Sequence, residues 1–205
     1  MKSDGNAYVV QNEKQLAALA SSARQEIIDV LSQMGTVSVA ELASALGRPA
    51  DSLYYHLNVL KEIGLVVAAG NREQGNRKEE LLRAVSSDLR LQYDIGRERR
   101  KITAIVSSML RLGIRDFRSS MQNSKVKLSG PGRELWALRK TGWLTSQEIG
   151  RVNQRIEGLA NDVSKPRGRG RLYAITVLLT PLDHRARSSG NKPAARKRKR
   201  NGDRR

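Results

Sequence analysis

The chain has 205 residues, with 38 Lys and Arg against 20 Asp and Glu, and its formal net charge at pH 7 is +18. Aromatic residues make up 4% and cysteine is absent, which excludes disulfides and thiolate metal sites and leaves aliphatic side chains to build a core. So large a positive excess indicates a polyanionic partner, either a nucleic acid or an anionic membrane. The sequence contains no apolar run near the roughly 18 residues of a membrane span and no secretion signal, so we expect a cytoplasmic, nucleoid-associated protein.

The first elements expected are an N-terminal arm, residues 1–13, and a helix after it. Apolar residues from Leu16 to Met34 recur at steps of three and four, which predicts one continuous helix. In "TVSVAELASALG", Ser38 and Glu41 have the spacing of a capping box and therefore predict the start of a second helix. Gly47 is typical of a helix C-terminus.

The stretch "GRPADSLYYHLNVLKEIGLV", residues 47–66, predicts a third helix over residues 49–63. Its leucines recur at helical spacing, which indicates one buried stripe, while the polar residues between them face outward. We expect Tyr54 at one flank of this outward face, partly packed against the first helix. The stripe consists of Leu53, Leu57 and Leu60, and the outward residues are Ser52, Tyr55, His56 and Asn58.

A hairpin is expected next, because two β-prone runs, residues 65–69 and 79–85, flank a polar and turn-rich stretch at residues 70–78. The stretch carries three cations near Gly75 and Asn76. An ordinary solvated turn would explain them, but a hairpin tip that contacts a nucleic-acid backbone explains them better. The three cations are Arg72, Arg77 and Lys78.

Helix, short turn, helix and basic hairpin together are the arrangement of a winged helix-turn-helix domain. Residues 14–85, above all the run "HLNVLKEIGLV", resemble the ArsR-type winged helix-turn-helix regulators of prokaryotes. The resemblance implies a homodimer, a palindromic operator and a small-molecule effector whose identity the sequence does not give. The metal-sensing branch of that family is not expected, because the chain lacks Cys and its two histidines, His56 and His184, are 128 positions apart.

The predicted DNA contacts lie on helix 49–63, in the turn before it and on the wing. His56 has a competing interpretation as a buried, satisfied histidine. The residues predicted to contact DNA are Arg48, Ser52, Tyr54, Tyr55, His56, Asn58, Lys61, Arg72, Arg77 and Lys78.

Residues 86–122 predict the longest helix of the chain. Its apolar seam needs a partner, which is either the same helix of a second subunit or the rest of the chain. Residues 134–143 read as a short helix, Thr145 and Glu148 as a second capping box, and residues 172–182 as a strand. Trp136 and Trp143 either pack in a core or line an effector pocket. The seam, predicted as a dimer interface, consists of Ile95, Ile102, Ile105, Met109 and Leu112.

The last segment, residues 183–205, is a basic tail with ten Lys and Arg after residue 184 and Asp203 as their one acid, and we expect it to be disordered. "KPRGRG", residues 165–170, resembles an AT-hook without its second proline, and a flexible connector is the more ordinary explanation. Nothing in the sequence pairs a nucleophile with a base or forms a phosphate-binding loop, so neither an enzyme nor a cofactor is expected.

We therefore predict a mainly α fold with a small β-hairpin wing: a winged helix-turn-helix domain at residues 14–85, a helical region for dimerisation and effector binding at 86–182, and the tail. The function predicted is that of a homodimeric, sequence-specific transcriptional regulator. Helix 49–63 would lie in the major groove and the wing, residues 70–78, on the DNA backbone. The alternative is an architectural, nucleoid-type DNA-binding protein that uses its tail with little sequence specificity.

Overall fold

The computed structural model describes residues 7–10, 12–74, 77–91, 95–164 and 170–182. Within these ranges the helices and strands follow in the order β1 (Tyr8–Val10), α1 (Glu13–Leu19), α2 (Ser22–Met34), β2 (Val37–Ser38), α3 (Val39–Leu46), α4 (Asp51–Glu62), β3 (Val66–Gln74), β4 (Arg77–Ala84), β5 (Leu89–Leu91), α5 (Ile95–Met121) and α6 (Ser146–Ser164). The predicted mainly α fold with a small wing is confirmed.

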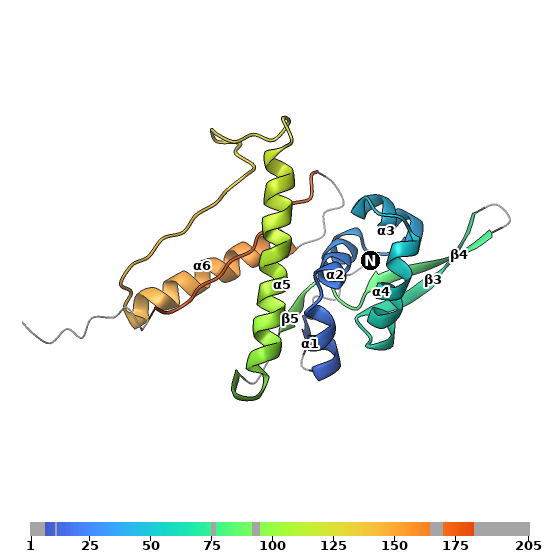
Figure 1. The fold of residues 1–205 in the computed structure, drawn as a ribbon, viewed down its shortest axis with the longest axis horizontal. Helices are drawn as coiled ribbons and strands as arrows, with labels where there is room; N and C mark the ends of the chain where they lie inside the picture. The colour runs from blue at the N-terminus through green and yellow to red at the C-terminus, as the bar shows by residue number, and fades with distance from the viewer. Residues whose placement is uncertain (1–6, 11, 75–76, 92–94, 165–169, 183–205) are drawn as a thin grey trace, which may run out of the picture.

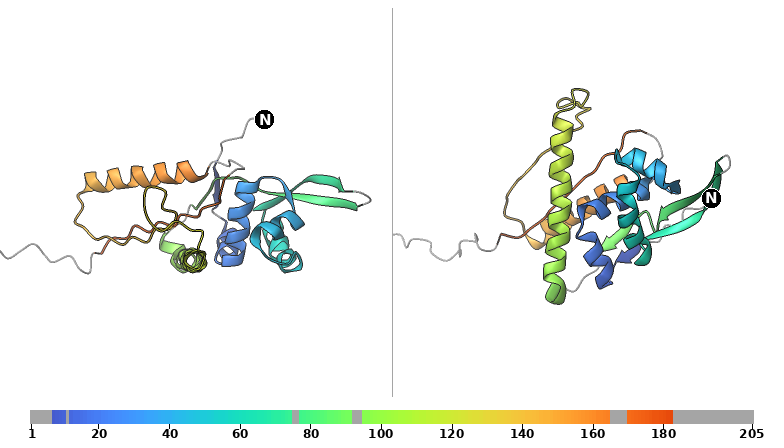
Figure 2. Two further views of the ribbon diagram at one scale, coloured as in Figure 1. Left: turned by 90° about the horizontal axis from the view of Figure 1, so that it is seen from above. Right: turned by 45° about the vertical axis from the view of Figure 1, so that its right-hand side comes forward.

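The long helix α5 separates two unequal parts of the molecule (Figure 1). On one side lie α1–α4 and the β3–β4 hairpin, which projects away from α5, and on the other side lies α6 (Figures 1 and 2). The strand order β2-β4-β3 makes the hairpin part of a three-stranded antiparallel sheet. The compact part of the chain is therefore a winged helix-turn-helix unit, and α5 packs on it through α1 and α2.

The core of the winged unit is aliphatic, as the composition predicts. The stripe of α4 is confirmed, since Leu53, Leu57 and Leu60 are at most 2% exposed. Each such side chain contributes about 1.5–3 kcal/mol when removed from water. Residues from β1 to α5 share this core, and its fully buried large members are Val10, Leu16, Ile27, Leu31, Leu42, Leu53, Leu57, Leu60, Leu65, Val66, Leu82 and Ile105.

The prediction of one continuous first helix is wrong, because the chain breaks between α1 and α2. Ser21 is the N-cap residue of α2, with an extended backbone of φ −98° and ψ 122° and no capping hydrogen bond from its side chain. The Arg24 Nε donates a hydrogen bond to the Ala18 carbonyl at 2.7 Å, which supplies a donor to a carbonyl in the last turn of α1. Serines favour helix ends over helix interiors. The apolar spacing continues across the break, so periodicity alone does not reveal it.

Both predicted capping boxes are confirmed. The Glu41 backbone N–H donates to Ser38 Oγ at 3.2 Å, and the Ser38 N–H donates to Glu41 Oε2 at 2.8 Å. At the start of α6, the Thr145 N–H donates to Glu148 Oε2 at 2.8 Å and the Glu148 N–H donates to Thr145 Oγ1 at 3.3 Å. Gly47 ends α3 in the left-handed conformation with φ 62°, so the turn into α4 is tight.

The hairpin exists where it is predicted, but its strands are longer than the β-prone runs. β3 and β4 continue through the polar stretch to Gln74 and Arg77, with an irregularity between Ala68 and Asn71 where Gly70 has φ 104°. Opposite charges face each other across the pair, Arg72 with Glu79 and Glu73 with Lys78. Such cross-strand pairs stabilise polar strands that project into solvent. Prediction from β propensity alone therefore makes these strands too short.

Two short strands replace parts of the predicted arm and of the predicted long helix. Tyr8–Val10 pairs in parallel with Leu89–Leu91, and α5 begins only at Ile95. Val10 is fully buried, and Gln15 Nε2 donates both to the Tyr8 hydroxyl and to the Ile63 carbonyl at 2.8 Å. Three-residue strands are too short to leave a periodic signal.

Two predicted C-terminal elements do not form in the described chain. Residues 134–143 are not helical, and residues 172–182 do not form a strand. Glu134 connects the two stretches, because Tyr173 Oη and Arg171 Nη1 contact its Oε1 at 2.5 and 3.2 Å. These contacts connect the two stretches, but they do not bury the apolar side chains of either stretch.

Candidate nucleic-acid interface

The outer face of α4 carries the polar residues that could read a nucleic acid. Tyr54 is 51% exposed and Tyr55 is 69% exposed, and Asn58 is exposed beside them. Residues 54 and 58 are one helical turn apart, and this face lies opposite the buried leucine stripe. The exposed fraction of Tyr54 agrees with a half-packed side chain at the flank of this face, and Tyr55 is the more exposed of the two rings.

His56 lies at the edge of this face and not at its centre. Its position three residues after Leu53 turns the imidazole toward the buried side of α4, where it is half-buried. Burial first, and then the nearby charges of Arg24 and Arg48, lower its pKa, so the ring is neutral at pH 7. Its Nδ1 is buried and has no hydrogen-bond partner among the described residues, while its ring meets that of Tyr55 edge-on at 5.4 Å.

The outer face of α4 also carries two acids that the sequence reasoning did not single out. Asp51 and Glu62 are exposed at the two ends of the helix, on the same side as Tyr54 and Asn58. Helical spacing from Asn58 would have identified both. A carboxylate repels phosphate, but in the major groove it accepts a hydrogen bond from the cytosine amino group, so these acids favour base edges over backbone.

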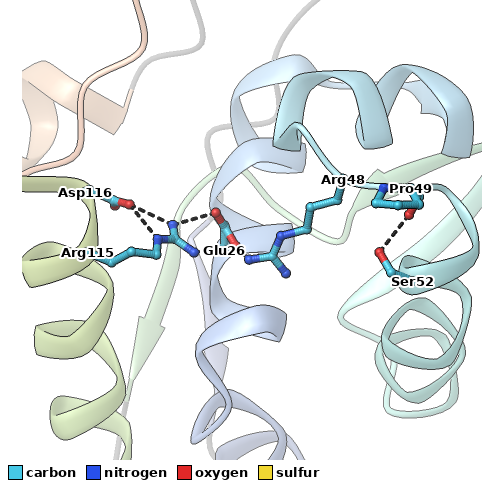
Figure 3. Close-up of polar contacts among 6 residues, drawn as sticks. All are labelled: Glu26, Arg48, Pro49, Ser52, Arg115 and Asp116. Carbon is cyan, nitrogen blue, oxygen red and sulfur yellow. Dashed lines mark hydrogen bonds and ion pairs between the residues drawn. The ribbon is translucent and has the colours of Figure 1, made fainter. Parts of the chain in front are cut away.

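Arg48, predicted to contact DNA, is engaged within the chain (Figure 3). Its guanidinium forms an ion pair with Glu26 of α2. Glu26 also binds Arg115 of α5 at 2.6 Å, and Arg115 contacts Asp116 at 2.7 Å (Figure 3). Glu26 therefore joins the turn before α4 to the long helix α5.

Ser52, also predicted to contact DNA, is exposed. Its Oγ donates a hydrogen bond to the Pro49 carbonyl at 2.7 Å (Figure 3).

Replacing Glu26 by Gln is expected to lower the free energy of unfolding by about 1–2 kcal/mol, because two guanidinium groups lose their carboxylate in a partly buried site. The matched control is Asp116→Asn, which removes an acid from the exposed end of the same cluster. We expect the control to cost less than about 0.5 kcal/mol. Urea denaturation of both variants measures the difference, and equal losses would contradict a bridging role for Glu26.

Two further cations predicted to contact DNA also lie in ion pairs. Arg72 Nη2 is 3.0 Å from carboxylate oxygens of Glu41 and of Glu79, so it fastens the wing to α3. Hydrogen bonding to the Ser38 backbone N–H, followed by the Arg72 guanidinium, lowers the pKa of Glu41. Lys61 Nζ is 2.7 Å from Glu80.

Lys78 is exposed and, unlike Arg72, makes no ion pair within the described residues. Arg77 lies in β4, but its side chain is outside the described residues, as is the tip at residues 75–76. The tail and the AT-hook-like residues 165–169 are also outside them.

The predicted dimer seam on α5 is largely covered by the chain itself. Ile105 is 1% exposed and belongs to the core of the winged unit, and Leu112 is 8% exposed. Ile102 is half-buried and Met109 is 37% exposed, whereas the side chain of Ile95 is outside the described residues. Of the two partners that the sequence left open for this seam, the rest of the chain is the one that covers Ile105.

The interpretation of the tryptophans as core residues is wrong, because Trp136 is 67% exposed and Trp143 is 81% exposed. The Arg133 guanidinium lies over the Trp136 ring at 4.5 Å from its centre.

A family model described as a helix-turn-helix domain matches residues 19–67, which run from the end of α1 to the first residues of β3. Residues 19–67 therefore match a helix-turn-helix domain of the ArsR type. Helix-turn-helix domains of this type are DNA-binding domains of transcriptional regulators.

Two solved structures are similar to the chain, each with 25% sequence identity and a TM-score of 0.28. One is a solution structure of the homodimeric winged helix-turn-helix DNA-binding domain, fragment 1–100, of a possible ArsR-family transcriptional regulator from Mycobacterium bovis, and the match covers 48% of this chain and 72% of that one. The other is a crystal structure of a possible transcriptional regulatory protein, fragment 1–100, from the same organism, with 49% and 85% covered. No curated protein matches the chain.

No described helix is long and apolar enough to cross a membrane. Within the same residues, no three His, Asp or Glu side chains gather closely enough to hold a metal ion.

Proposed function

We propose that the protein is a homodimeric, sequence-specific transcriptional regulator whose α4 reads the major groove. The observation that carries the proposal is the division of α4 into two faces. One face buries Leu53, Leu57 and Leu60 completely, and the other presents Tyr54, Tyr55 and Asn58 to solvent. A helix held this firmly is a rigid support for residues that must meet base edges.

The chemistry of the exposed face suits base recognition. An α-helix fits the major groove of B-DNA, and an Asn side chain can make two hydrogen bonds to an adenine there. Each Tyr hydroxyl can donate or accept a hydrogen bond, and its ring can pack on a thymine methyl group. The hairpin lies beside α4 and brings Lys78 to the neighbouring backbone, where a cation contributes affinity without specificity.

A homodimer would place two copies of α4 in successive major grooves. The two half-sites would then be about one helical turn apart, roughly 34–36 Å, and the operator would be an inverted repeat. The test is a selection from random duplex oligonucleotides with the full chain. A symmetric motif supports the proposal, whereas the absence of any enriched motif would favour the architectural, nucleoid-type alternative.

The tail is expected to add affinity without specificity. A chain that ends at Asp183 should show a shallower dependence of log K on log salt, by about 0.9 for each phosphate that the tail no longer neutralises, and should select the same motif. Fluorescence anisotropy at several salt concentrations measures the slope. The matched control is the full-length chain with the tail Lys and Arg replaced by Gln, which keeps the length and removes the charge.

If the truncated chain shows no sequence preference, specificity does not reside in the winged unit and the regulator proposal fails. If the slope is unchanged, the tail does not contact the DNA.

A further inference from the structure

An open groove of about 640 Å³ lies along the C-terminal half of α5. Its volume is within the roughly 300–1,000 Å³ of sites that bind small molecules. The lining positions follow one another at steps of three and four, so they share one face of the helix. We call this feature the α5 groove, and the residues that line it, all of them exposed, are Arg111, Ile114, Arg115, Arg118, Ser119 and Gln122.

The α5 groove is positively charged. Of its three arginines, Arg115 has carboxylate partners, Glu26 at 2.6 Å and Asp116 at 2.7 Å. Within the part of the chain that the structure describes, no carboxylate forms an ion pair with Arg111 or Arg118. Like charges one helical turn apart repel each other and destabilise a helix. An anion in the groove would relieve that repulsion and interact favourably with all three guanidinium groups.

The other side chains of the α5 groove indicate what kind of anion fits. Ile114 is 53% exposed and lies between the arginines, where it offers an apolar contact. Ser119 and Gln122 can each donate a hydrogen bond without adding charge. A guanidinium group binds a carboxylate or a phosphate through two parallel hydrogen bonds. The lining therefore fits an organic molecule with one carboxylate or phosphate group and an apolar body.

Arg115 belongs both to the α5 groove and to the cluster around Glu26 (Figure 3). Glu26 also forms an ion pair with Arg48, in the turn before α4. The Glu26 side chain is 16% exposed. A carboxylate with so little access to water is costly to leave without a cation. If one of the two arginines leaves Glu26, the other is therefore held more strongly.

We propose that the α5 groove binds a small organic anion through its three arginines and that this binding lowers the affinity of the protein for DNA. The coupling rests on the proposed function, because it assigns a phosphate contact to Arg48. When the anion holds Arg115, Glu26 retains Arg48 and keeps it from the DNA. When a DNA phosphate holds Arg48, Glu26 retains Arg115 and keeps it from the anion. By thermodynamic linkage, each ligand lowers the affinity for the other by the same factor.

The binding test is isothermal titration calorimetry of the full chain with benzoate and with phenyl phosphate, which carry the two anionic groups on the same ring. At least one of them should bind more tightly than inorganic phosphate, by about tenfold, because its ring covers Ile114. The double variant Arg111→Gln, Arg118→Gln should weaken that binding by more than about tenfold, since hydrogen bonds to a charged group are lost.

The matched control is Arg99→Gln, Arg100→Gln, which removes the same charge at exposed positions near the other end of α5 and should bind the anion as the wild-type chain does. All four arginines are exposed, so both double variants should keep the thermal midpoint of the wild-type chain by circular dichroism.

The coupling test is fluorescence anisotropy with a DNA duplex at constant ionic strength, because added salt weakens DNA binding by itself. A saturating concentration of the anion that binds should lower the affinity for DNA by about fivefold or more. Glu26→Gln retains the three arginines of the groove and removes the shared carboxylate. This variant should still bind the anion, and its affinity for DNA should no longer respond to it.

The anion site is refuted if neither benzoate nor phenyl phosphate binds, or if the Arg111→Gln, Arg118→Gln variant binds as the wild-type chain does. A salt slope for DNA that is shallower by about 0.9 for each arginine replaced, with neither anion bound, would assign these arginines to the DNA backbone instead. Anion binding that leaves the affinity for DNA unchanged would refute the coupling. A chain that binds the anion and selects no DNA motif would refute the proposed function and support the anion site.

Discussion

Replacing Tyr54, Tyr55 and Asn58 together by Ala is expected to abolish sequence preference while leaving the protein folded and still able to bind DNA through charge. The three side chains stand on the exposed face of α4 and make no core contact, so removing them should change stability little. Removing one base interaction should cost about 1–3 kcal/mol, and removing three should reduce the preference for the selected motif by more than about a hundredfold. Competition between the motif and random DNA measures this ratio.

The matched control is His56→Ala, on the same helix but at the edge of the buried side. It should leave the selected motif unchanged, because the ring is half-buried and its pKa is lowered first by burial and then by the charges of Arg24 and Arg48. Lys78→Ala should lower the salt slope by about one unit and also leave the motif unchanged. If the triple variant keeps the preference of the wild-type chain, α4 does not read the bases.

The sequence was enough to predict the winged unit because its signals are local. Capping boxes, a left-handed Gly and leucines at helical spacing each constrain a few neighbouring residues, and those constraints agree with one another. The same reasoning grouped His56 with the outward residues of this helix, whereas its side chain is half-buried. The leucine stripe defines the buried side, but the side on which a flanking residue falls depends on how α2 lies against α4.

The cations show a second limit of sequence reasoning. Arg48 and Arg72 look available for phosphate in the sequence, although acids at positions 73, 79 and 80 dilute the charge around Arg72. Their partners, Glu26 and Glu41, are 22 and 31 positions away. Only the tertiary fold brings these charges together, and the basic character of the interface is therefore weaker on the winged unit than the composition suggests.

The region after α5 shows a third limit. Helical spacing predicts the apolar positions of α6, and the helix forms. β-Branched composition predicts a strand at residues 172–182, and no strand forms there in the described chain. Composition indicates a preference for a strand but does not identify the strand with which it would pair.

Replacing Leu57 by Ala is expected to lower the free energy of unfolding by about 2–5 kcal/mol, because the change leaves a cavity under α4. Leu57 is 2% exposed and belongs to the aliphatic core. The loss is a large part of the roughly 5–15 kcal/mol that stabilises a typical domain. Urea denaturation followed by circular dichroism measures it, and the matched control is Val59→Ala, a half-exposed residue of α4 that should cost less than about 1.5 kcal/mol.

The Leu57→Ala variant should also bind DNA less well, but for a different reason from the triple variant of the exposed face. Its folded molecules keep Tyr54, Tyr55 and Asn58, so it should select the wild-type motif with an affinity reduced in proportion to its folded fraction. Adding saturating operator DNA should raise its thermal midpoint, because binding stabilises the folded state. The triple variant should keep its midpoint and lose the motif. If both variants lost the motif in the same way, the two faces of α4 would not have separate roles in anchoring and reading.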